Sequence, residues 1–287
     1  MGDENNPYRG PDAKPLLRPS VVAFVDILGY KDYIKTAFEK GEAQVELSRL
    51  RNALDEAYLH LKDAARERSI EGKASFAVRT FTDNLLIAYP VNEQAGSWSA
   101  LMMVFTYLEH LQMQLARQGY FVRGAISVGD LYADEDIVFG PALLEAYESE
   151  GKDAMSPRII LGDSAEKSLR EHCIEYQVTK VPDVLIDSDN RVFVDYLENN
   201  VMIAFPDDGP FFDWLEDHKC AVVAKLKEFG TIPRIRQKYE WVAAYHNAFC
   251  DTYPEHFDES HKVPISVLYP KPAPWMVARQ SDNAPET

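Results

Sequence analysis

The sequence feature that most constrains the fold is residues 21–30, where an apolar run leads into Asp26 and then Gly29. An apolar run of this length that ends in a turn is typical of a buried central strand. Burying an ionised carboxylate is strongly unfavourable unless a cation or hydrogen bonds compensate its charge. The fold must therefore bring a partner for Asp26 to the end of this strand, and a bound metal ion is one such partner.

A second stretch predicts the companion of Asp26. In residues 77–89, two β-prone runs flank Thr82, Asp83 and Asn84. Short polar residues between two such runs are typical of a β-hairpin, so we expect Asp83 at its tip. Two strand-end carboxylates that meet at one edge of a sheet form a site for a hard divalent cation.

The spacing of apolar residues predicts the order of elements in the first half of the chain. We expect a strand at 21–27, helices at 31–38 and 47–65, the hairpin, a helix at 98–115, and a strand at 120–128 that ends in a turn at Gly129-Asp130. This order is the split βαββαβ arrangement, with both main helices on one face of an antiparallel sheet. The predicted fold class is therefore α+β with a ferredoxin-like core. In that topology the first strand lies beside the hairpin, which places Asp26 and Asp83 close together.

The second half continues this core and then becomes helical. Pro141 fits the first position of a helix that Gly151 would end, and Asp163 with Glu166 fits a capping box. Strands are expected at 157–161 and 191–197, and helices at 211–229 and 233–250. The expected organisation is a flexible N-terminal segment (1–19), an α+β domain (20–200), a C-terminal helical extension (201–252) and a Pro-rich tail (253–287).

Composition argues against several classes of function. The formal net charge of −16 is unfavourable for a nucleic-acid or anionic-membrane surface. The three cysteines, Cys173, Cys220 and Cys250, have no metal-binding spacing and fit free thiols in a reducing compartment. No apolar run is long enough to span a bilayer, and the polar N-terminus lacks the apolar core of a signal peptide. We expect a cytoplasmic protein with no nucleic-acid and no membrane partner.

The two acids favour phosphoryl chemistry. A lone Asp at a strand end is most often a turn or helix-capping residue. Two acids that an independently inferred topology brings together favour another role, because paired carboxylates hold the two cations of phosphoryl-transfer sites. Mg²⁺ or Mn²⁺ suits a site with oxygen ligands only. The turn Leu28-Gly29-Tyr30 leads into a predicted helix whose free amide groups could cradle a triphosphate.

Other polar residues have simpler interpretations. Arg123, between apolar residues of a strand, is more often an ion-paired structural residue than a phosphate ligand. His246 lies on the apolar face of its helix, where a hydrogen-bonded core histidine is expected. The sequence has no P-loop, no nucleophile-elbow motif and no Cys/His cluster, which argues against the common kinase, hydrolase and zinc sites.

Four segments together carry a family pattern: Phe24-Val25-Asp26-Ile27-Leu28-Gly29-Tyr30, Phe81-Thr82-Asp83-Asn84, Val122-Arg123-Gly124-Ala125-Ile126-Ser127-Val128-Gly129 and Phe139-Gly140-Pro141-Ala142-Leu143. In order and spacing they resemble the catalytic-domain landmarks of class III nucleotidyl cyclases. They look most like those of the bacterial Pycsar pyrimidine cyclases, which make cyclic UMP or cyclic CMP as an antiphage signal. The resemblance covers about residues 21–197.

The resemblance implies roles for single residues. Asp26 and Asp83 would bind two Mn²⁺ or Mg²⁺ ions per active site, and Ile27 would add a backbone carbonyl. Phe24 and Arg79 would lie against the nucleotide, beside the Leu28-Gly29-Tyr30 turn. The family also implies a homodimer with its active sites at the subunit interface, where a second copy contributes residues around 123–136.

The chain departs from the family in one place. Adenylate and guanylate cyclases carry an Asn and an Arg on the helix after the fourth strand, and the matching positions here are about Leu144 and Glu148. Arg79 and Arg123 are candidates for a replacement cation. The departure favours the pyrimidine branch over a purine cyclase.

The sequence therefore predicts a metal-dependent uridylate cyclase, a lyase that converts UTP to 3′,5′-cyclic UMP and pyrophosphate. The product would be a second messenger in antiphage defence and would act on an effector that responds to cyclic nucleotides. The alternatives are a cytidylate cyclase and a catalytically silent cyclase-like module that binds a nucleotide and regulates a partner. A palm-type polymerase or diguanylate cyclase shares the two acids, but its Gly-Gly-Asp/Glu-Glu/Asp-Phe hairpin and basic template groove are not evident in the sequence.

Overall fold

An eight-stranded sheet organises the residues that the computed structural model describes, which are 6–10, 12, 14–67, 77–81, 83–92, 96–202 and 210–268. The strands are β1 (Arg18–Ile27), β2 (Ala77–Phe81), β3 (Asn84–Pro90), β4 (Val122–Ala133), β5 (Val138–Phe139), β6 (Ile159–Leu161), β7 (Val184–Ile186) and β8 (Val192–Val194). The helices are α1 (Tyr30–Glu39), α2 (Ala43–Glu67), α3 (Gly96–Arg117), α4 (Pro141–Asp153), α5 (Asp163–Glu175), α6 (Glu198–Val201), α7 (Phe212–Glu228), α8 (Pro233–Thr252) and α9 (Ile265–Leu268). Across the sheet the order is β2-β3-β1-β4-β6-β8-β7, and β5 pairs with β4 alone.

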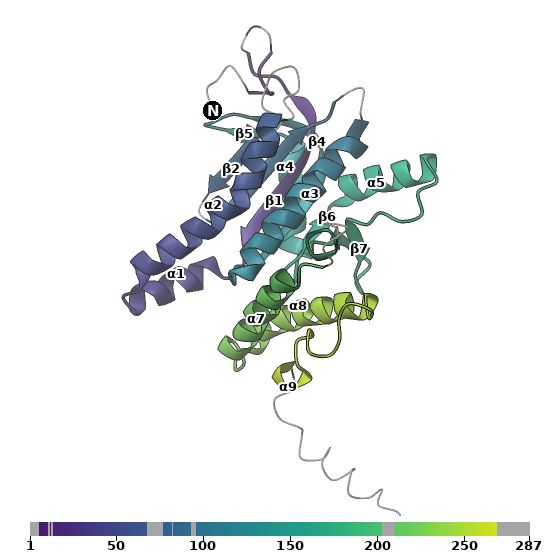
Figure 1. Ribbon diagram of the computed structural model, residues 1–287. Coiled ribbons are helices and arrows are strands. Elements are labelled where there is room, and N and C mark those ends of the chain that lie inside the picture. The colour runs from purple at the N-terminus through teal and green to yellow at the C-terminus, as the bar shows by residue number, and fades with distance from the viewer. Residues whose placement is uncertain are drawn as a thin grey trace, which may run out of the picture.

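The first four strands and their helices form the predicted βαββαβ core. β1 pairs antiparallel with β3 on one side and with β4 on the other, and β2 and β3 form the hairpin. Alternate residues of β1, Val21, Ala23 and Val25, pack with α2 and α3 in one hydrophobic cluster, as expected for a strand with a period of two. Figure 1 shows α2 and α3 side by side across this face of the sheet. The α+β class and the order of the core elements are confirmed.

The opposite face of the sheet is covered by α4 and by the C-terminal helices. α4 packs against β1 and β4. A second hydrophobic cluster joins α7 and α8 to the sheet through Ala125 of β4, Ile160 of β6 and Phe193 of β8. The helices α7 and α8 lie side by side in Figure 1. The predicted C-terminal helices are present and share a core with the sheet, while the domain boundaries stay a prediction. No helix within the described ranges has both the length and the apolar character needed to cross a membrane.

Part of the N-terminal segment packs onto the sheet. Tyr8 is fully buried, and its hydroxyl oxygen lies 3.0 Å from Ser20 Oγ. Arg9 forms an ion pair with Asp134 at 3.3 Å. Tyr8 and Arg9 therefore contact the sheet and its β4–β5 turn, while the flexibility expected of the segment as a whole stays a prediction. Residues 269–287 of the expected Pro-rich tail lie outside the described residues.

The predicted end of β4 is wrong. The strand continues through Gly129-Asp130 because β1 extends beside it, with Ser20 opposite Gly129 and Pro19 opposite Asp130. The turn comes at Asp134 instead. Its Oδ1 accepts hydrogen bonds at 2.9 Å from the backbone N–H groups of Asp136 and Ile137.

Two predicted helix ends are also wrong. The sequence predicted that Gly151 would end this helix, but α4 passes through Gly151 and ends at Asp153. The N-cap of α5 is Gly162, and no side chain caps it, so Asp163 does not form the predicted capping box. The backbone N–H of Ser164 donates instead to Glu145 Oε1 at 2.8 Å, which is a tertiary contact that local sequence does not reveal.

The strand predicted at 191–197 is the shorter β8, because Asp195 ends it. Its Oδ1 accepts the backbone N–H groups of Leu197 and Glu198, at 3.2 and 3.4 Å, where α6 begins. No sequence pattern predicts β7 or α6. Both are too short for their apolar residues to establish a period.

A pair of stacked histidines lies between α7 and α8. His218 and His246 are fully buried, with nearly parallel rings 5.2 Å apart and Nδ1 atoms 3.0 Å apart. The Tyr196 hydroxyl lies 2.8 Å from His218 Nε2, and His246 Nε2 lies 3.0 Å from the carbonyl oxygen of His261. Burial lowers the pKa of both imidazoles, that of His246 to about 4. The prediction that His246 is a hydrogen-bonded core residue is confirmed.

A carboxyl group is buried between α3 and α6. Glu109 Oε2 accepts a hydrogen bond from Asn199 Nδ2 at 2.8 Å, and burial raises the pKa of Glu109 to about 9. Its carboxyl group is therefore protonated at neutral pH in the folded protein. The unfolded chain loses the same proton near the ordinary Glu pKa of about 4.3.

The first prediction follows from this difference. The protonated Glu109 stabilises the folded protein fully at low pH, and that contribution is lost as pH rises through the folded pKa. Thermal melts between pH 6 and 9.5 should therefore show a steeper loss of melting temperature for the wild-type protein than for Glu109→Gln. Glu175→Gln, on the exposed surface of α5, is the control and should keep the wild-type slope. Parallel slopes for Glu109→Gln and the wild type would contradict the assignment.

Candidate active site

A row of polar side chains crosses the centre of the sheet at the end of β1. β1 lies between β3 and β4, and the strand register pairs Asp26 with Asn84 on one side and with Arg123 on the other. Paired residues of adjacent strands project from the same face of a sheet. This face is opposite to α2 and α3, since Val25 and Ile27 of β1 face those helices. Asp26 therefore lies on the face that carries α4 and the C-terminal helices.

The structure brings Asp83 next to Asp26, as predicted. The backbone N–H of Ile27 donates to the carbonyl oxygen of Asp83 at 3.0 Å, which joins the end of β1 to the β2–β3 hairpin. Asn84 Nδ2 donates to Asp83 Oδ1 at 3.1 Å. The negative charge of Asp83 is one of the causes that raise the pKa of Asp26, so the two carboxyl groups are close enough to repel each other.

Arg123 compensates part of this negative charge. Its Nε donates to Asp26 Oδ2 at 3.1 Å and lies 2.8 Å from Glu150 Oε1. Burial is the largest cause that raises the pKa of Asp26 and of Glu150, and the guanidinium opposes both shifts. Arg123 is therefore ion-paired within its own chain. This agrees with the prediction that it is an ion-paired structural residue and not a phosphate ligand.

Glu150 is a site residue that the sequence reasoning missed. It lies on α4, far from Asp26 in the chain, and only the packing of α4 on the sheet brings it to Arg123. One signal in the sequence could have found it. Ala142, Ala146 and Glu150 follow each other at intervals of four and form the buried side of α4, so a carboxylate stands in line with two core residues.

A close approach of β4 to β1 fixes these groups. A Cβ at Gly124, the residue after Arg123, would lie 2.5 Å from the carbonyl oxygen of Phe24. Only glycine fits this position, since real Cβ atoms do not come so near to backbone oxygen. Gly124 thus holds the two strands together at the point where Asp26 and Arg123 pair.

The acids and the end of β1 form an all-oxygen donor set. Two carboxylates and the Ile27 carbonyl are hard ligands that suit Mg²⁺ or Mn²⁺. Within the described ranges no group of three or more His, Cys, Asp or Glu residues forms a closed metal site. Two carboxylates and one backbone carbonyl would leave coordination positions of Mg²⁺ to other ligands, and this ion usually keeps several waters.

The remaining predicted site residues lie around the acids. Phe24 is half-buried two residues before Asp26, and its ring meets Tyr147 of α4 edge-to-face at 5.5 Å. The backbone N–H of Leu28 donates to the Phe121 carbonyl at 2.8 Å, and Gly29 takes the left-handed conformation with φ 76° as the N-cap of α1. The side chain of Arg79 and all of Thr82 lie outside the described residues, although the backbone of Arg79 pairs with Leu86 in the hairpin.

A cavity of about 820 Å³ begins at the end of β1. One part of its wall is the segment from Ile27 to Tyr30, and a second wall comes from α7 and α8. Residues of α1, α2 and the end of α3 complete the lining. Its size suits a small-molecule ligand with several polar groups. No sequence pattern predicted this cavity, because its second wall comes from the C-terminal helices.

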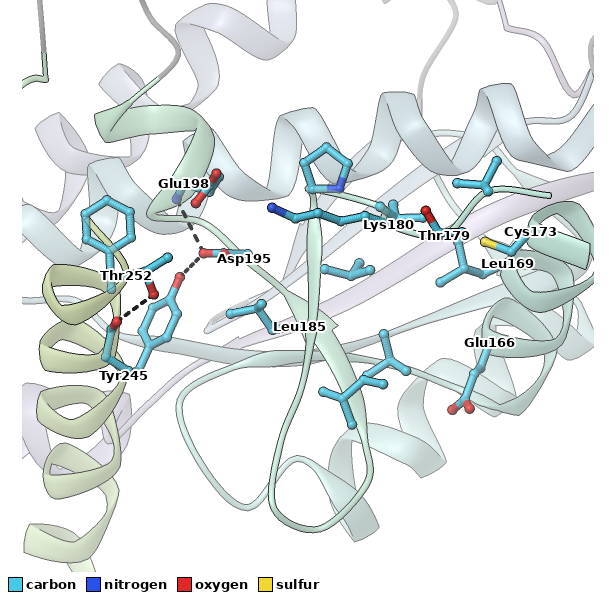
Figure 2. Close-up of a pocket in the computed structure, with 18 of the residues that line it drawn as sticks. Glu166, Leu169, Cys173, Thr179, Lys180, Leu185, Asp195, Glu198, Tyr245 and Thr252 are labelled. Atoms are coloured by element: carbon cyan, nitrogen blue, oxygen red, sulfur yellow. Dashed lines mark hydrogen bonds between the residues drawn. The ribbon is translucent and has the colours of Figure 1, made fainter. Parts of the chain in front are cut away.

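A second cavity, of about 670 Å³, lies away from the acids between α5, β7 and α8. Figure 2 shows Leu169 and Cys173 at one end and Asp195 at the other, between Tyr245 and Glu198. The Tyr245 hydroxyl donates to Asp195 Oδ1 at 2.5 Å. This carboxylate also accepts two backbone N–H groups, so its hydrogen bonds serve the start of α6.

The positions matched to the purine-cyclase Asn and Arg lie on the outer surface of α4. Leu144 and Glu148 are both exposed. Neither side chain offers a cation or an amide to the site. Arg123 is a cation that the structure places beside Asp26.

The second prediction concerns the buried charge of Asp26. Since burial raises its folded pKa, Asp26 stabilises the folded protein below the ordinary Asp pKa, and this contribution is lost as pH rises through the raised folded value. Without added metal, Asp26→Asn should therefore melt at a higher temperature than the wild type at pH 8, and the difference should shrink toward pH 4. Thermal melts across this range measure it, with exposed Asp213→Asn as control. A lower melting temperature of Asp26→Asn at pH 8 would show that Arg123 stabilises the carboxylate more than burial penalises it.

Comparison with known proteins gives partial matches of fold. No protein-family model and no curated protein matches the chain. A class III adenylyl cyclase-like ATP-binding protein from Pseudomonas aeruginosa aligns at a TM-score of 0.37 and 11% identity. The alignment covers 53% of this chain and only 35% of the length of that protein. An adenylate/guanylate cyclase/hydrolase from Silicibacter pomeroyi aligns at a TM-score of 0.36 and 15% identity, over 62% of this chain and 95% of that one. The chain is similar to both proteins over part of its length, and a functional assignment has to rest on its own residues.

Proposed function

We propose that the chain is a metal-dependent class III nucleotidyl cyclase that converts UTP to 3′,5′-cyclic UMP and pyrophosphate. The observation that carries the proposal is the adjacency of Asp26 and Asp83 at one end of β1, in a sheet with βαββαβ order. Three of the four sequence segments that resemble class III cyclases meet at this place, because they contribute the end of β1, Asp83 with Asn84, and the start of β4. The fourth, residues 139–143, lies at the other end of β4, where Phe139 pairs with Tyr132.

The reaction is an intramolecular displacement at phosphorus. The ribose 3′ oxygen attacks the α-phosphorus, the bond from the α-phosphorus to the bridging oxygen breaks, and pyrophosphate leaves with that electron pair. The proton of the 3′ hydroxyl passes to solvent. Divalent cations, when bound, promote loss of this proton and neutralise charge on the phosphates. No protein nucleophile is required.

The residues of the chain hold and orient the reactants. Asp26 and Asp83 supply carboxylate ligands for both cations, and Ile27 supplies a backbone carbonyl. The turn Leu28-Gly29-Tyr30 presents the first amides of α1 toward the triphosphate. Phe24 and Arg79 are proposed to lie against the nucleotide, Phe24 from the same face of β1 as Asp26.

The choice of a pyrimidine base rests on the resemblance and on α4. The exposed Leu144 and Glu148 leave the purine-cyclase Asn and Arg without counterparts, which supports a uridylate or cytidylate cyclase over a purine cyclase. The same observation favours a second candidate, a nucleotide-binding regulatory module without turnover. In the first case the product would act as an antiphage second messenger through an effector that binds cyclic nucleotides.

The third prediction tests the two-metal assignment. Offered all four nucleoside triphosphates with Mn²⁺, the wild-type protein should release pyrophosphate and form cyclic UMP, identified by mass spectrometry. Asp26→Asn and Asp83→Asn should each lose at least about a hundredfold in turnover, because each removes a charge that stabilises the transition state. Both should also lose the rise in melting temperature that Mn²⁺ gives the wild type.

Asp213→Asn serves as the control and should keep both activity and the Mn²⁺ effect, since it is exposed on α7. Nucleotide binding without pyrophosphate release would favour the regulatory module. Near-normal turnover by either folded site variant would contradict the two-metal site.

We also propose that the working unit is a homodimer with active sites at its interface. Large apolar side chains are exposed just before β5 (Ile137), on β5 (Phe139) and on α4 (Leu144 and Tyr147). α4 packs on β1 and β4, the strands that carry Asp26 and Arg123. Exposed apolar patches of this kind mark interaction sites. A second copy on this surface would exclude water from the triphosphate. Arg123 cannot be the residue that the partner contributes, because it is paired with Asp26 and Glu150 of its own chain.

The fourth prediction tests this interface. Leu144→Glu places a charge in the proposed contact and should convert the dimer to a monomer in sedimentation velocity, with most of the activity lost. Ile174→Glu is the matched control, since Ile174 is an exposed apolar residue on α5 that lies away from this patch. Wild-type activity in a monomeric Leu144→Glu protein would rule out an interface site.

A further inference from the structure

The cavity beside the acids is bordered by two cations from the C-terminal extension. Lys238 and Arg234 lie on α8 and line the same cavity as Gly29 and Tyr30. Lys238 is half-buried, and Arg234 is exposed at the rim. They are four residues apart, so both side chains project from one side of the helix.

Lys238 is also close to the metal-binding acids. The negative charges of Asp26 and Glu150 raise its pKa, whereas burial and the positive charges of Arg123 and Arg234 lower it. Lys238 thus shares a cavity with the turn that begins α1 and carries its charge within the field of the Asp26 and Glu150 carboxylates. This is the place where a triphosphate bound to the acids would extend into the cavity.

Among the described residues, neither Lys238 nor Arg234 has an ion pair or a side-chain hydrogen bond. Two other cations that line this cavity are paired: Arg117 with Asp217 and Lys225 with Glu228. Two like charges one helical turn apart destabilise a helix. Acidic side chains, among them Asp32, Asp217 and Glu228, also line this cavity. Within the described residues Lys238 and Arg234 form no ion pair with them, and two cations without an ion pair at one cavity favour an anionic ligand there.

We infer that Lys238, assisted by Arg234, binds the β- and γ-phosphates of the nucleoside triphosphate. The inference rests on the proposed cyclase function and extends it, because it assigns a substrate contact to the C-terminal helices. In adenylate and guanylate cyclases an Arg occupies the position that matches the exposed Glu148 of α4. Here Lys238 and Arg234 would supply positive charge from α8 instead. The active site is then complete only when α8 is packed on the sheet.

The fifth prediction uses inorganic tripolyphosphate, which carries the phosphate charges without a base. Isothermal titration in the presence of Mn²⁺ should show binding to the wild-type protein and about tenfold weaker binding to Lys238→Gln, equivalent to about 1.4 kcal/mol. Arg234→Gln should weaken binding less, because Arg234 is the more exposed residue. Lys238→Arg should retain most of the affinity, since it keeps the charge.

Lys227→Gln is the matched control, because Lys227 is exposed on the neighbouring helix α7 and does not line the cavity. It should bind tripolyphosphate as the wild type does. Melting temperatures verify that each variant is folded, and if Lys238→Gln does not fold, the comparison of Lys238→Arg with Arg234→Gln decides. Equal affinity of Lys238→Gln and the wild type, or no binding by the wild type, would overturn the inference. Cyclic nucleotide formation by the wild type tests the proposed function separately, so the two can fail independently.

Discussion

The charge of Asp26 is the constraint on which the surrounding structure depends. It stands on a central strand whose neighbouring residues form the core, and burial there makes its ionised form costly. Arg123 on β4 compensates it, and Glu150 on α4 in turn lies against Arg123. The three groups come from three elements, so the position of α4 on the sheet is tied to the charge balance of the site. Removing Arg123 would leave both carboxyl groups without the cation that they share.

The parts of the site that local pattern predicts are those that end a strand. Asp26 and Asp83 each follow a β-prone run, and the order of elements was enough to place one beside the other. Glu150 and Lys238 could not be located in this way, because their roles arise where helices pack on the sheet. The same limit explains the wrong turn at Gly129, where pairing with Ser20 of β1 continues the strand. The local sequence therefore predicts the strands and the acids at their ends, whereas the residues that contact these acids depend on how the helices pack on the sheet.

The C-terminal helices combine a structural and a functional task. One side of α8, with Val242 and Phe249, is buried against the sheet, while Lys238 faces the cavity at the end of β1. The same hydrophobic contact that stabilises the fold therefore sets the distance between the cations of α8 and the carboxylates of β1. A change in the packing of this helix would alter the site without touching any of its residues.

The stacked histidines between α7 and α8 have a defined arrangement of protons. The carbonyl of His261 only accepts, so His246 must carry its hydrogen on Nε2, and its Nδ1 is left as an acceptor. His218 then donates from Nδ1, and its Nε2 accepts the hydroxyl hydrogen of Tyr196. One backbone oxygen thus fixes the tautomers of both rings and the orientation of a phenol on the far side of the stack. The chain of donors runs in one direction, and it has no acceptor left for an additional proton.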